Sequence, residues 1–383
     1  MTRQKMLWCG FGAVALLLAA GLAWFLILPP ASEAAAPAPL AQQTSKAMLA
    51  ALKPPKRQRP LVAIIGINDA TETTDYLMPY GILRRAGIAD VVALATAAGP
   101  VTLYPALKVE PDATTAAFDA QHPEGADYVF VPAMSRDDDP AALRWIRSQA
   151  AKGATIIGVC AGAKVVASAG LLDGREATTH WYYLKELRKA HPAVKLVANQ
   201  RLVVDGNVAT TTGITASMPA ALALIEAIAG PEKAQAVAHD LGLAHWDLGH
   251  DSQAFKFTRP FALTAIGNTL AFWQRERLGI ELQPGIDEVA LALVADAWSR
   301  TYRSRAVTFA ATASAIESRN GMRIIPDRIA REWDEGPSVP AFGAQPPAVA
   351  LDDALTAISS RYGSRTADFV AMQIEYPRQK AAR

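Results

Sequence analysis

The sequence predicts a doubly wound α/β fold built on a parallel sheet, and three observations carry this prediction. Continuous apolar runs such as LVAIIGI (61–67) and TIIGV (155–159) are typical of strands buried on both faces of a sheet. Helix-like segments separate the runs, as right-handed crossovers between parallel strands require. The chain has 383 residues, enough for two or three domains.

The first element is an apolar run over residues 7–28, which follows a short tail of residues 1–6. No residue from Met6 to Leu28 is charged, and about 22 residues span roughly 33 Å as a helix. We therefore expect a transmembrane anchor, with a cleaved signal peptide as the alternative. Because Arg3 and Lys5 precede the run, the positive-inside rule predicts a single-pass inner-membrane protein with a cytoplasmic tail and a periplasmic bulk.

Residues 29–59 are rich in Pro and Ala, which predicts an extended linker. The main domain is expected over residues 60–230. Its acidic loop at 137–139 is expected to cap the helix that begins near Pro140. Sheets of this class hold their sites at the carboxyl ends of the strands. Its strands are expected at 61–67, 91–96, 127–133 and 155–159.

The candidate site centres on Cys160, which lies between an apolar strand and an expected helix. Gly158 and Gly162 flank it in GVCAG, a spacing typical of a nucleophile elbow with sulfur in place of the serine oxygen. A helix N-terminus favours the thiolate, so we expect a lowered pKa for the Cys160 thiol, unless an ionised carboxyl lies close enough to repel the thiolate. The alternative is a buried thiol in a close-packed turn.

Two segments, GVCAGAKVVASAGLLDGREATTHWYYLKEL and VVDGNVATTTGITASMPAALALIEAI, make residues 61–229 resemble the ThiJ/PfpI superfamily, which has the class I glutamine amidotransferase-like fold. The sensor domains of AraC-type regulators and the isocyanide hydratases are the most similar branches. The resemblance implies a flavodoxin-like sheet, a homodimer and a reactive cysteine at Cys160. It also implies an acidic partner at Asp75, four residues before Pro79, with Glu72 nearby. The alternative role of both carboxyls is to complement a helix dipole.

His180, in ATTHW, matches a family histidine near the site. Three roles stay open for it: it could orient the cysteine, line a ligand pocket, or be a structural histidine whose ring nitrogens are satisfied by hydrogen bonds within the fold. The candidate catalytic set is Cys160, Asp75, Glu72 and His180. The expected ligand pocket is lined by Gly158, Ala161, Gly162, Ala133, Met134, Thr179 and Gly213.

Two departures from the family pattern bear on activity. Ala161 follows the cysteine, where proteases of the superfamily carry His and hydratases carry Thr or Ser. Ala133 and Met134 stand where many relatives have Gly-Gly, whose backbone N–H groups help to bind an oxyanion. Both departures favour a non-hydrolytic module that senses a small ligand or an oxidant. A cysteine-dependent hydratase or glyoxalase-type enzyme is the alternative, so whether the protein is an enzyme stays open.

The expected partner is a small molecule, with no cofactor, metal or nucleic acid. His239, His245 and His250 cluster without a cysteine, which favours loop histidines over a metal site. The 38 basic and 36 acidic residues give a net charge of +2, too little to grip a nucleic-acid backbone. Residues 269–280 are similar to a second DNA-reading helix of AraC-type proteins, but the first helix-turn-helix is missing.

An internal repeat marks the last third of the chain. Residues 91–112 align without gaps to residues 306–327 at an offset of 215, and the same offset pairs Glu72 with Asp287. We expect residues 231–286 to be a connecting helical region. Residues 287–383 are expected to form a degenerate half-repeat, a mixed α/β unit without an elbow.

Overall fold

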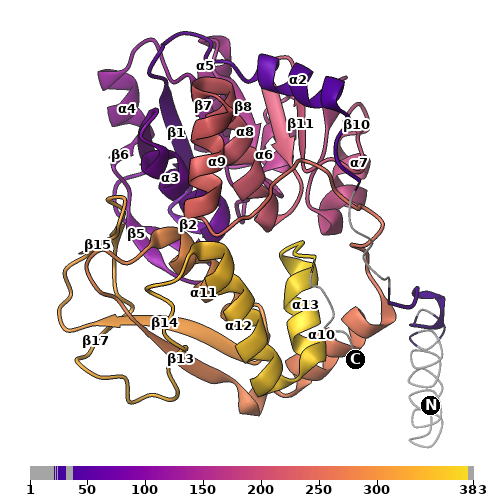
Figure 1. The fold of residues 1–383 in the computed structure, drawn as a ribbon, viewed down its shortest axis with the longest axis vertical. Coiled ribbons are helices and arrows are strands. Elements are labelled where there is room, and N and C mark those ends of the chain that lie inside the picture. Colours follow the sequence, from indigo (N-terminus) through magenta and orange to yellow (C-terminus); the bar gives the residue numbers. More distant parts are fainter. Residues whose placement is uncertain (1–20, 22, 24, 32–37, 378–383) are drawn as a thin grey trace, which may run out of the picture.

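The structure is a computed structural model that describes residues 21, 23, 25–31 and 38–377. In this part of the chain, the main sheet has seven strands in the order β11-β12-β8-β7-β1-β3-β6, all parallel to their neighbours except β11 and β12 (Figure 1). The strands are β1 Leu61–Gly66, β3 Asp90–Ala95, β6 Ala113–Thr114, β7 Tyr128–Val131, β8 Thr155–Gly158, β11 Leu202–Asp205 and β12 Val208–Thr211.

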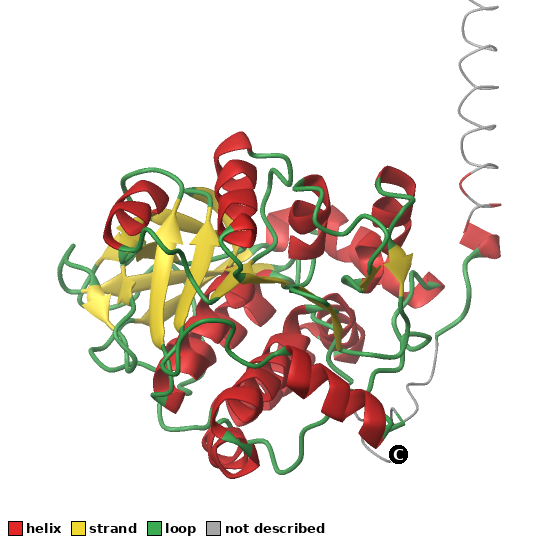
Figure 2. Ribbon diagram, turned by 90° about the horizontal axis from the view of Figure 1, so that it is seen from above, coloured by secondary structure: helices red, strands yellow, loops and turns green. Residues whose placement is uncertain are grey.

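Helices cover both faces of this sheet, as Figure 2 shows. Along β1, Val62 and Ile64 belong to one apolar cluster, whereas Leu61, Ala63 and Ile65 belong to another. The first cluster contains α3 (Thr73–Ala86) and α8 (Ser217–Ala229), and the second contains α5 (Pro140–Ala151) and α6 (Gly162–Ser168). The doubly wound, flavodoxin-like α/β fold is therefore confirmed.

Shorter elements complete the first domain. They are α2 Gln42–Ala51, α4 Thr115–Gln121, β9 Glu176–Ala177, η1 Trp181–Tyr183, α7 Leu184–Ala190, β10 Lys195–Leu196 and η2 Ile214–Ala216.

The chain then continues into a second α/β unit. Its strands β13 (Glu276–Glu281), β14 (Ser304–Ala310) and β17 (Arg328–Ile329) form a parallel sheet. The other elements are α9 Pro231–Asp240, α10 Arg259–Leu270, η3 Phe272–Gln274, α11 Glu288–Ser299, β15 Ile316–Glu317, β16 Arg323–Ile324, α12 Pro347–Tyr362 and α13 Ser364–Gln373. Residues 269–280 are not one helix, because α10 ends at Leu270 and the chain turns into β13.

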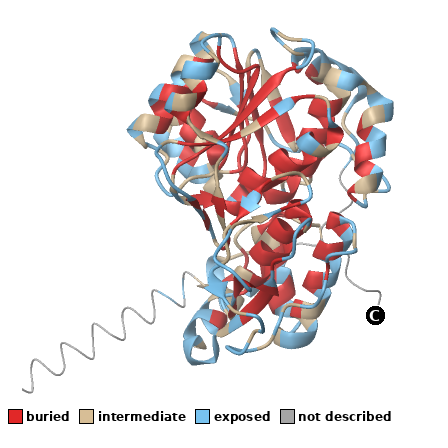
Figure 3. Ribbon diagram, turned by 90° about the vertical axis from the view of Figure 1, so that its left-hand side faces the viewer, coloured by how far each residue is buried: buried red, intermediate tan, exposed pale blue. Residues whose placement is uncertain are grey.

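A further sheet joins the two units. It runs in the order β15-β16-β5-β4-β2, where β2 is Asp69–Glu72, β4 is Val101–Tyr104 and β5 is Lys108–Glu110. Buried residues continue from the main sheet into the second unit, as the burial colours of Figure 3 show. The first apolar cluster accordingly includes side chains from both units.

The expected transmembrane anchor over residues 7–28 is wrong as stated, and with it the single-pass inner-membrane location. No helix within the described residues is long and apolar enough to cross a membrane. Spanning the hydrocarbon core takes about 20 consecutive apolar residues. Of the segment 7–28, the structure describes helix only at residues 21, 23 and 25–27, and the rest lies outside the described residues.

Candidate functional site

Cys160 lies at the turn between β8 and α6, as the elbow spacing predicts. Its backbone adopts φ 57°, a left-handed conformation that costs a non-glycine residue about 1–3 kcal/mol. Its N–H donates to Oγ1 of Thr211 at 3.1 Å, and its carbonyl accepts from the Thr179 hydroxyl at 2.9 Å. These hydrogen bonds offset part of the strain and hold the backbone of the turn in place.

The two flanking glycines allow the elbow to pack closely, Gly162 against β7 and Gly158 against α6. A Cβ on Gly162 would lie 1.9 Å from the carbonyl oxygen of Val131, which no side chain tolerates. On Gly158, it would lie 3.0 Å from Val166 and 3.1 Å from the backbone of Ala163. Both glycines therefore shape the turn, and Ala161 between Cys160 and Gly162 precedes the first residue of α6.

Two buried carboxyls at the start of α3 face the elbow. Glu72 caps the helix, because its Oε2 accepts from the N–H of Asp75 at 2.6 Å and from the Thr74 hydroxyl at 2.8 Å. Asp75 is fully buried, and its Oδ2 accepts from the N–H of Ala133 at 3.0 Å. Its Oδ1 has no hydrogen-bond partner in the described part of the chain.

The pKa values of both carboxyls are raised. Burial and the nearby charge of Asp296 raise the pKa of Glu72 to about 7. Burial, followed by repulsion from Glu72, raises the pKa of Asp75 well above its ordinary value. The surroundings of Asp75 therefore favour its protonated form, which is able to donate a proton or a hydrogen bond.

A cation from the second unit completes this cluster. Nη2 of Arg300 lies 2.8 Å from Oε1 of Glu72, and its Nε lies 2.6 Å from Oδ2 of Asp296. The Arg300 side chain is 14% exposed, so it compensates two buried carboxylates in a poorly solvated place.

The surroundings of Cys160 overturn the expectation of a lowered thiol pKa. The residue is 4% exposed. Burial raises the pKa of the Cys160 thiol well above its ordinary value, and Asp75, Glu72 and Glu375 add to this effect in their ionised forms. The helix that follows has seven residues, and its effect is smaller than these. The thiol form therefore dominates at neutral pH.

His180 forms a hydrogen bond with the last residue of α13. Its Nε2 lies 2.8 Å from the carbonyl oxygen of Gln373, and its Nδ1 accepts from the N–H of Tyr182 at 3.2 Å. Burial lowers its pKa, so the imidazole is neutral and donates through Nε2. Both ring nitrogens of His180 form hydrogen bonds with backbone groups. This favours a purely structural role over orienting the cysteine or lining a ligand pocket.

Residues 372–376, here termed the C-terminal strap, close this side of the site. The N–H of Trp181 donates to Oε1 of Glu375 at 2.7 Å, and the Thr215 hydroxyl donates to the carbonyl of Glu375 at 2.8 Å. A Cβ on Gly213 would lie 2.6 Å from the Glu375 side chain. Glu375 itself is 1% exposed and has φ 52°.

The expected pocket residues do not all meet. Both backbone polar groups of Ala133 form hydrogen bonds within the protein. Its carbonyl accepts from the N–H of Glu72 at 2.8 Å, and its N–H donates to Oδ2 of Asp75. Met134 pairs with Thr71 in an isolated bridge. Gly213 is covered by the strap, whereas Thr179 lines a pocket.

That pocket has a volume of about 220 Å³. Oγ1 of Thr212, Nδ1 of His250 and Oε2 of Glu375 are buried in it without hydrogen-bond partners among the described residues, although Nε2 of His250 lies 3.4 Å from Oε2 of Glu375. Its walls also include Thr178, Trp181, Leu184, Arg188, Leu196, Val197, Ala198, Ser252 and Gln253.

Several residues of the site and the pocket were not predicted from the sequence. His250 was expected in a surface loop but is 4% exposed. Arg300 had a signal, because it stands 215 residues after Arg85. Glu375 also stands 215 residues after Cys160, but no local sequence pattern marks it as a site residue. The described residues hold no cluster of three or more metal-ligating side chains.

A sequence model of the DJ-1/PfpI family matches residues 62–227. The chain is 42% identical to the isonitrile hydratase of Pseudomonas putida over 100 residues, which cover 26% of this chain and 42% of that protein. It is 32% identical to the HTH-type transcriptional regulator CdhR of Pseudomonas aeruginosa over 125 residues, 33% of this chain and 37% of that protein. The matches thus span about two fifths of these relatives.

A relative that is matched over almost its whole length is the Parkinson disease protein 7 homolog of Danio rerio. It is 28% identical over 181 residues, which cover 46% of this chain and 93% of that protein. Among solved structures, Drosophila melanogaster DJ-1beta aligns with a TM-score of 0.44 at 24% identity, over 49% of this chain and 100% of that chain.

Proposed function

Because residues 62–227 form a DJ-1/PfpI family domain, we propose that this protein is a non-hydrolytic module that senses a small ligand beside the elbow cysteine. The observation that carries the proposal is the use of the Ala133 N–H. Asp75 accepts from it at 3.0 Å, so this donor is not free to stabilise an oxyanion. A buried thiol with a raised pKa is also a poor nucleophile and a slow target for oxidants.

The pocket next to the elbow supports a small ligand rather than an oxidant as the signal. Thr179 lines the pocket, and its hydroxyl donates to the carbonyl of Cys160. The Thr179 side chain therefore connects a ligand bound in the pocket with the elbow. Burial lowers the pKa of His250, which leaves Nδ1 of a neutral imidazole as an acceptor. With the Glu375 carboxylate beside it, the pocket suits a small molecule that donates hydrogen bonds.

The test is binding without turnover. We expect butylamine, a small donor with an apolar tail, to raise the melting temperature of the full chain in a saturable manner. Thr212→Val removes a pocket hydroxyl and should weaken this binding at least tenfold, whereas Thr102→Val, on an exposed site in β4, should not change it. Equal binding by both variants would place the ligand elsewhere.

One observation favours a second candidate, a hydratase acting on a small electrophile. The raised pKa of Asp75 favours its protonated form, and its Oδ1 has no partner within the described residues, so the protonated carboxyl can deliver a proton. Isonitrile hydration adds one water to R–NC and yields R–NH–CHO. Formation of N-butylformamide from butyl isonitrile, abolished by Cys160→Ser, would replace the sensing module by this activity.

A further inference from the structure

The second unit repeats the first half of the main domain at a constant interval of 215 residues. The repeated elements are β1 and β13 (61–66 and 276–281), the first residues of α3 and α11 (73 and 288), the last residues of β3 and β14 (95 and 310), the first residues of β5 and β16 (108 and 323), and β6 and β17 (113–114 and 328–329).

Hydrogen bonds repeat at the same interval. Oδ2 of Asp112 accepts from the N–H of Ala93 at 2.8 Å, and Oδ2 of Asp327 accepts from the N–H of Thr308 at 2.9 Å. Chance similarity in an alanine-rich sequence would not reproduce both the element bounds and the contacts. We infer that the two units are copies of one ancestral unit.

The two copies meet around a local two-fold axis. β5 and β16 pair antiparallel, with Val109 opposite Ile324, its own equivalent. On either side, Glu110 lies opposite Arg323, and the N–H of Ile325 donates to the carbonyl of Lys108 at 2.8 Å. Ile325 is the equivalent of Glu110, and Lys108 is the equivalent of Arg323, so the second contact repeats the first with the two copies exchanged. This exchange is the pattern of an isologous dimer interface.

Two ion pairs across the contact are reciprocal. Nη2 of Arg300 lies 2.8 Å from Oε1 of Glu72, and Nη2 of Arg85 lies 2.6 Å from Oδ2 of Asp287. Residues 85 and 300 are equivalent at the interval of 215, and so are residues 72 and 287. The same arginine–carboxylate contact is thus made twice, once in each direction.

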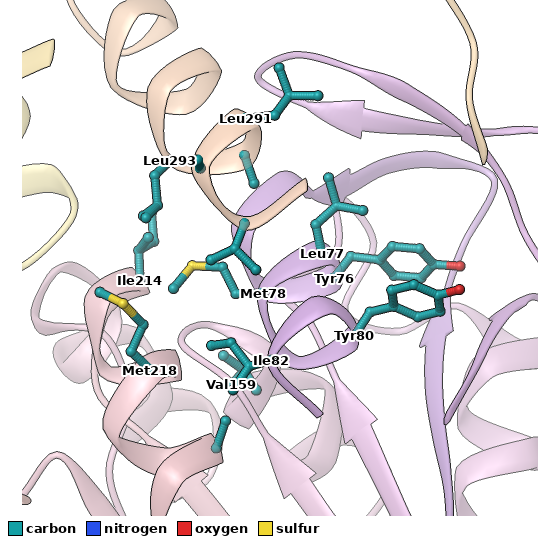
Figure 4. Close-up of a cluster of buried hydrophobic side chains, with 14 of the residues drawn as sticks. Tyr76, Leu77, Met78, Tyr80, Ile82, Val159, Ile214, Met218, Leu291 and Leu293 are labelled. Atoms are coloured by element: carbon teal, nitrogen blue, oxygen red, sulfur yellow. The ribbon is translucent and has the colours of Figure 1, made fainter. Parts of the chain in front are cut away.

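The helices α3 and α11 form the apolar centre of this contact. A Cβ on Gly81 would lie 2.6 Å from Cγ2 of Val289, so the helices touch closely. Leu291 and Leu293 of α11 belong to the same buried cluster as Leu77 and Met78 of α3 (Figure 4).

We propose that the second unit takes the place of a second subunit, so that one chain contains the contact that two copies of the ancestral domain would make. The copy covers the equivalents of residues 61–114, the part that lies at the two-fold contact. It has no equivalent of β8 and the elbow, because α12 and α13 follow β17 in the described residues. The homodimer implied by the family resemblance is therefore replaced, at this face, by an internal pseudo-dimer with one site.

The site depends on this arrangement, because Arg300 belongs to the copy and contacts Glu72 beside the elbow. It acts through Glu72 rather than on a ligand, so Arg300 is a positioning residue. Arg85 makes the equivalent contact on the side that has no elbow. This inference does not depend on which ligand the pocket takes.

Cross-linking tests the replacement of the second subunit in the full chain. Glu110→Cys with Arg323→Cys should give a disulfide within one chain, identified by the linked peptides and a monomer on a non-reducing gel. Lys108→Cys with Glu110→Cys should give no more disulfide-linked dimer than the wild type, whose Cys9 and Cys160 set the background. Dimers formed through residues 108 and 110 would overturn the proposal, because they require a second copy on β5.

The role of Arg300 is tested by following the carboxyl of Glu72 in a ¹³C NMR titration. Arg300→Gln should move the Glu72 midpoint upward by one pH unit or more, and Arg300→Lys should restore most of it. Arg85→Gln removes the equivalent ion pair and should leave the midpoint where it is. An unchanged midpoint in Arg300→Gln, or an equal shift in Arg85→Gln, would remove Arg300 from the site. The lysine variant keeps the test usable if the glutamine variant does not fold.

Discussion

Cys160 combines a strained backbone with a sulfur surrounded by acidic side chains. The positive φ of the elbow is held by hydrogen bonds to Thr211 and Thr179. The same turn brings the sulfur close to Asp75 and Glu72, where a thiolate would face like charge in a poorly solvated place. The surroundings therefore favour the protonated forms of both the Cys160 thiol and the Asp75 carboxyl.

The first residue-scale prediction concerns thiol reactivity. With a raised pKa, Cys160 should alkylate with iodoacetamide more slowly than glutathione at pH 7.5. Glu375→Gln removes one of the repelling charges and should speed the reaction several-fold. The exposed Glu176→Gln should leave the rate unchanged. Wild-type alkylation faster than that of glutathione would contradict the assignment of a neutral thiol.

The second prediction concerns pH and follows from Glu72. Its pKa is about 7 in the folded protein against an ordinary value of 4.5, so the folded state holds this proton more tightly. Stability from this group is therefore present below pH 4.5 and is lost as the pH rises to about 7. The loss is on the order of 3 kcal/mol.

Urea unfolding of the wild type and of Glu72→Gln at several pH values measures the contribution of Glu72 to the free energy of unfolding. Relative to the variant, which cannot ionise, the wild type should lose stability between pH 5 and 7 and then level off. A constant difference across that window would show that Glu72 does not titrate there.

The sequence predicted the residues of the elbow better than their surroundings. Cys160, Gly158 and Gly162 stand in one short segment, so local spacing identifies the turn. Asp75 is identified only through the family resemblance, in which the acidic partner stands four residues before a proline. The cover formed by Glu375 and the cation at Arg300 come from distant segments, which meet the site only after the second unit has packed.

At the scale of elements, a helix cap was predictable from the sequence, whereas a strand that depends on its pairing was not. Asp139 caps α5 through the N–H groups of Ala141 and Ala142, as expected for the acidic loop before Pro140. Strand β13 was not expected, since it lies in the stretch 231–286 assigned to a helical connection. Its sequence ERLGIE contains only two strongly apolar residues, and its pairing with β14 decides its conformation.

The element-scale prediction uses two glycines. Gly162→Ala places a methyl group 1.9 Å from a backbone oxygen of β7 and should cost about 3 kcal/mol, the upper end of the usual range for overpacking, or prevent folding. Gly267→Ala, in the interior of α10 with open space around it, should stabilise the chain by up to about 1 kcal/mol. Thermal unfolding compares the two, and a tolerated Gly162→Ala would mean that the elbow can move away from β7.

At the scale of the whole molecule, one apolar cluster includes α3, α8 and α11. Because the two units share this core, they should unfold together rather than as independent domains. The sequence could predict a repeat from its spacing, but not that the two copies would pack face to face.

Leu291→Ala tests this shared core. The side chain is fully buried, so its truncation should cost about 2–5 kcal/mol. In urea, circular dichroism and Cys160 alkylation should both report the lowered midpoint, although Cys160 lies in the other unit. Ile329→Ala, at an exposed position, should change neither. Separate midpoints for the two probes would show that the units unfold independently.

The pairing of β5 with β16 has a consequence for synthesis of the chain. β5 leaves the ribosome 215 residues before its partner strand, an interval of roughly 10–40 s at ordinary translation rates. During that time the nascent first domain carries an open strand edge and an uncovered apolar face on α3. The nascent chain is therefore most exposed to wrong pairing, and most in need of a chaperone, before its last third is made.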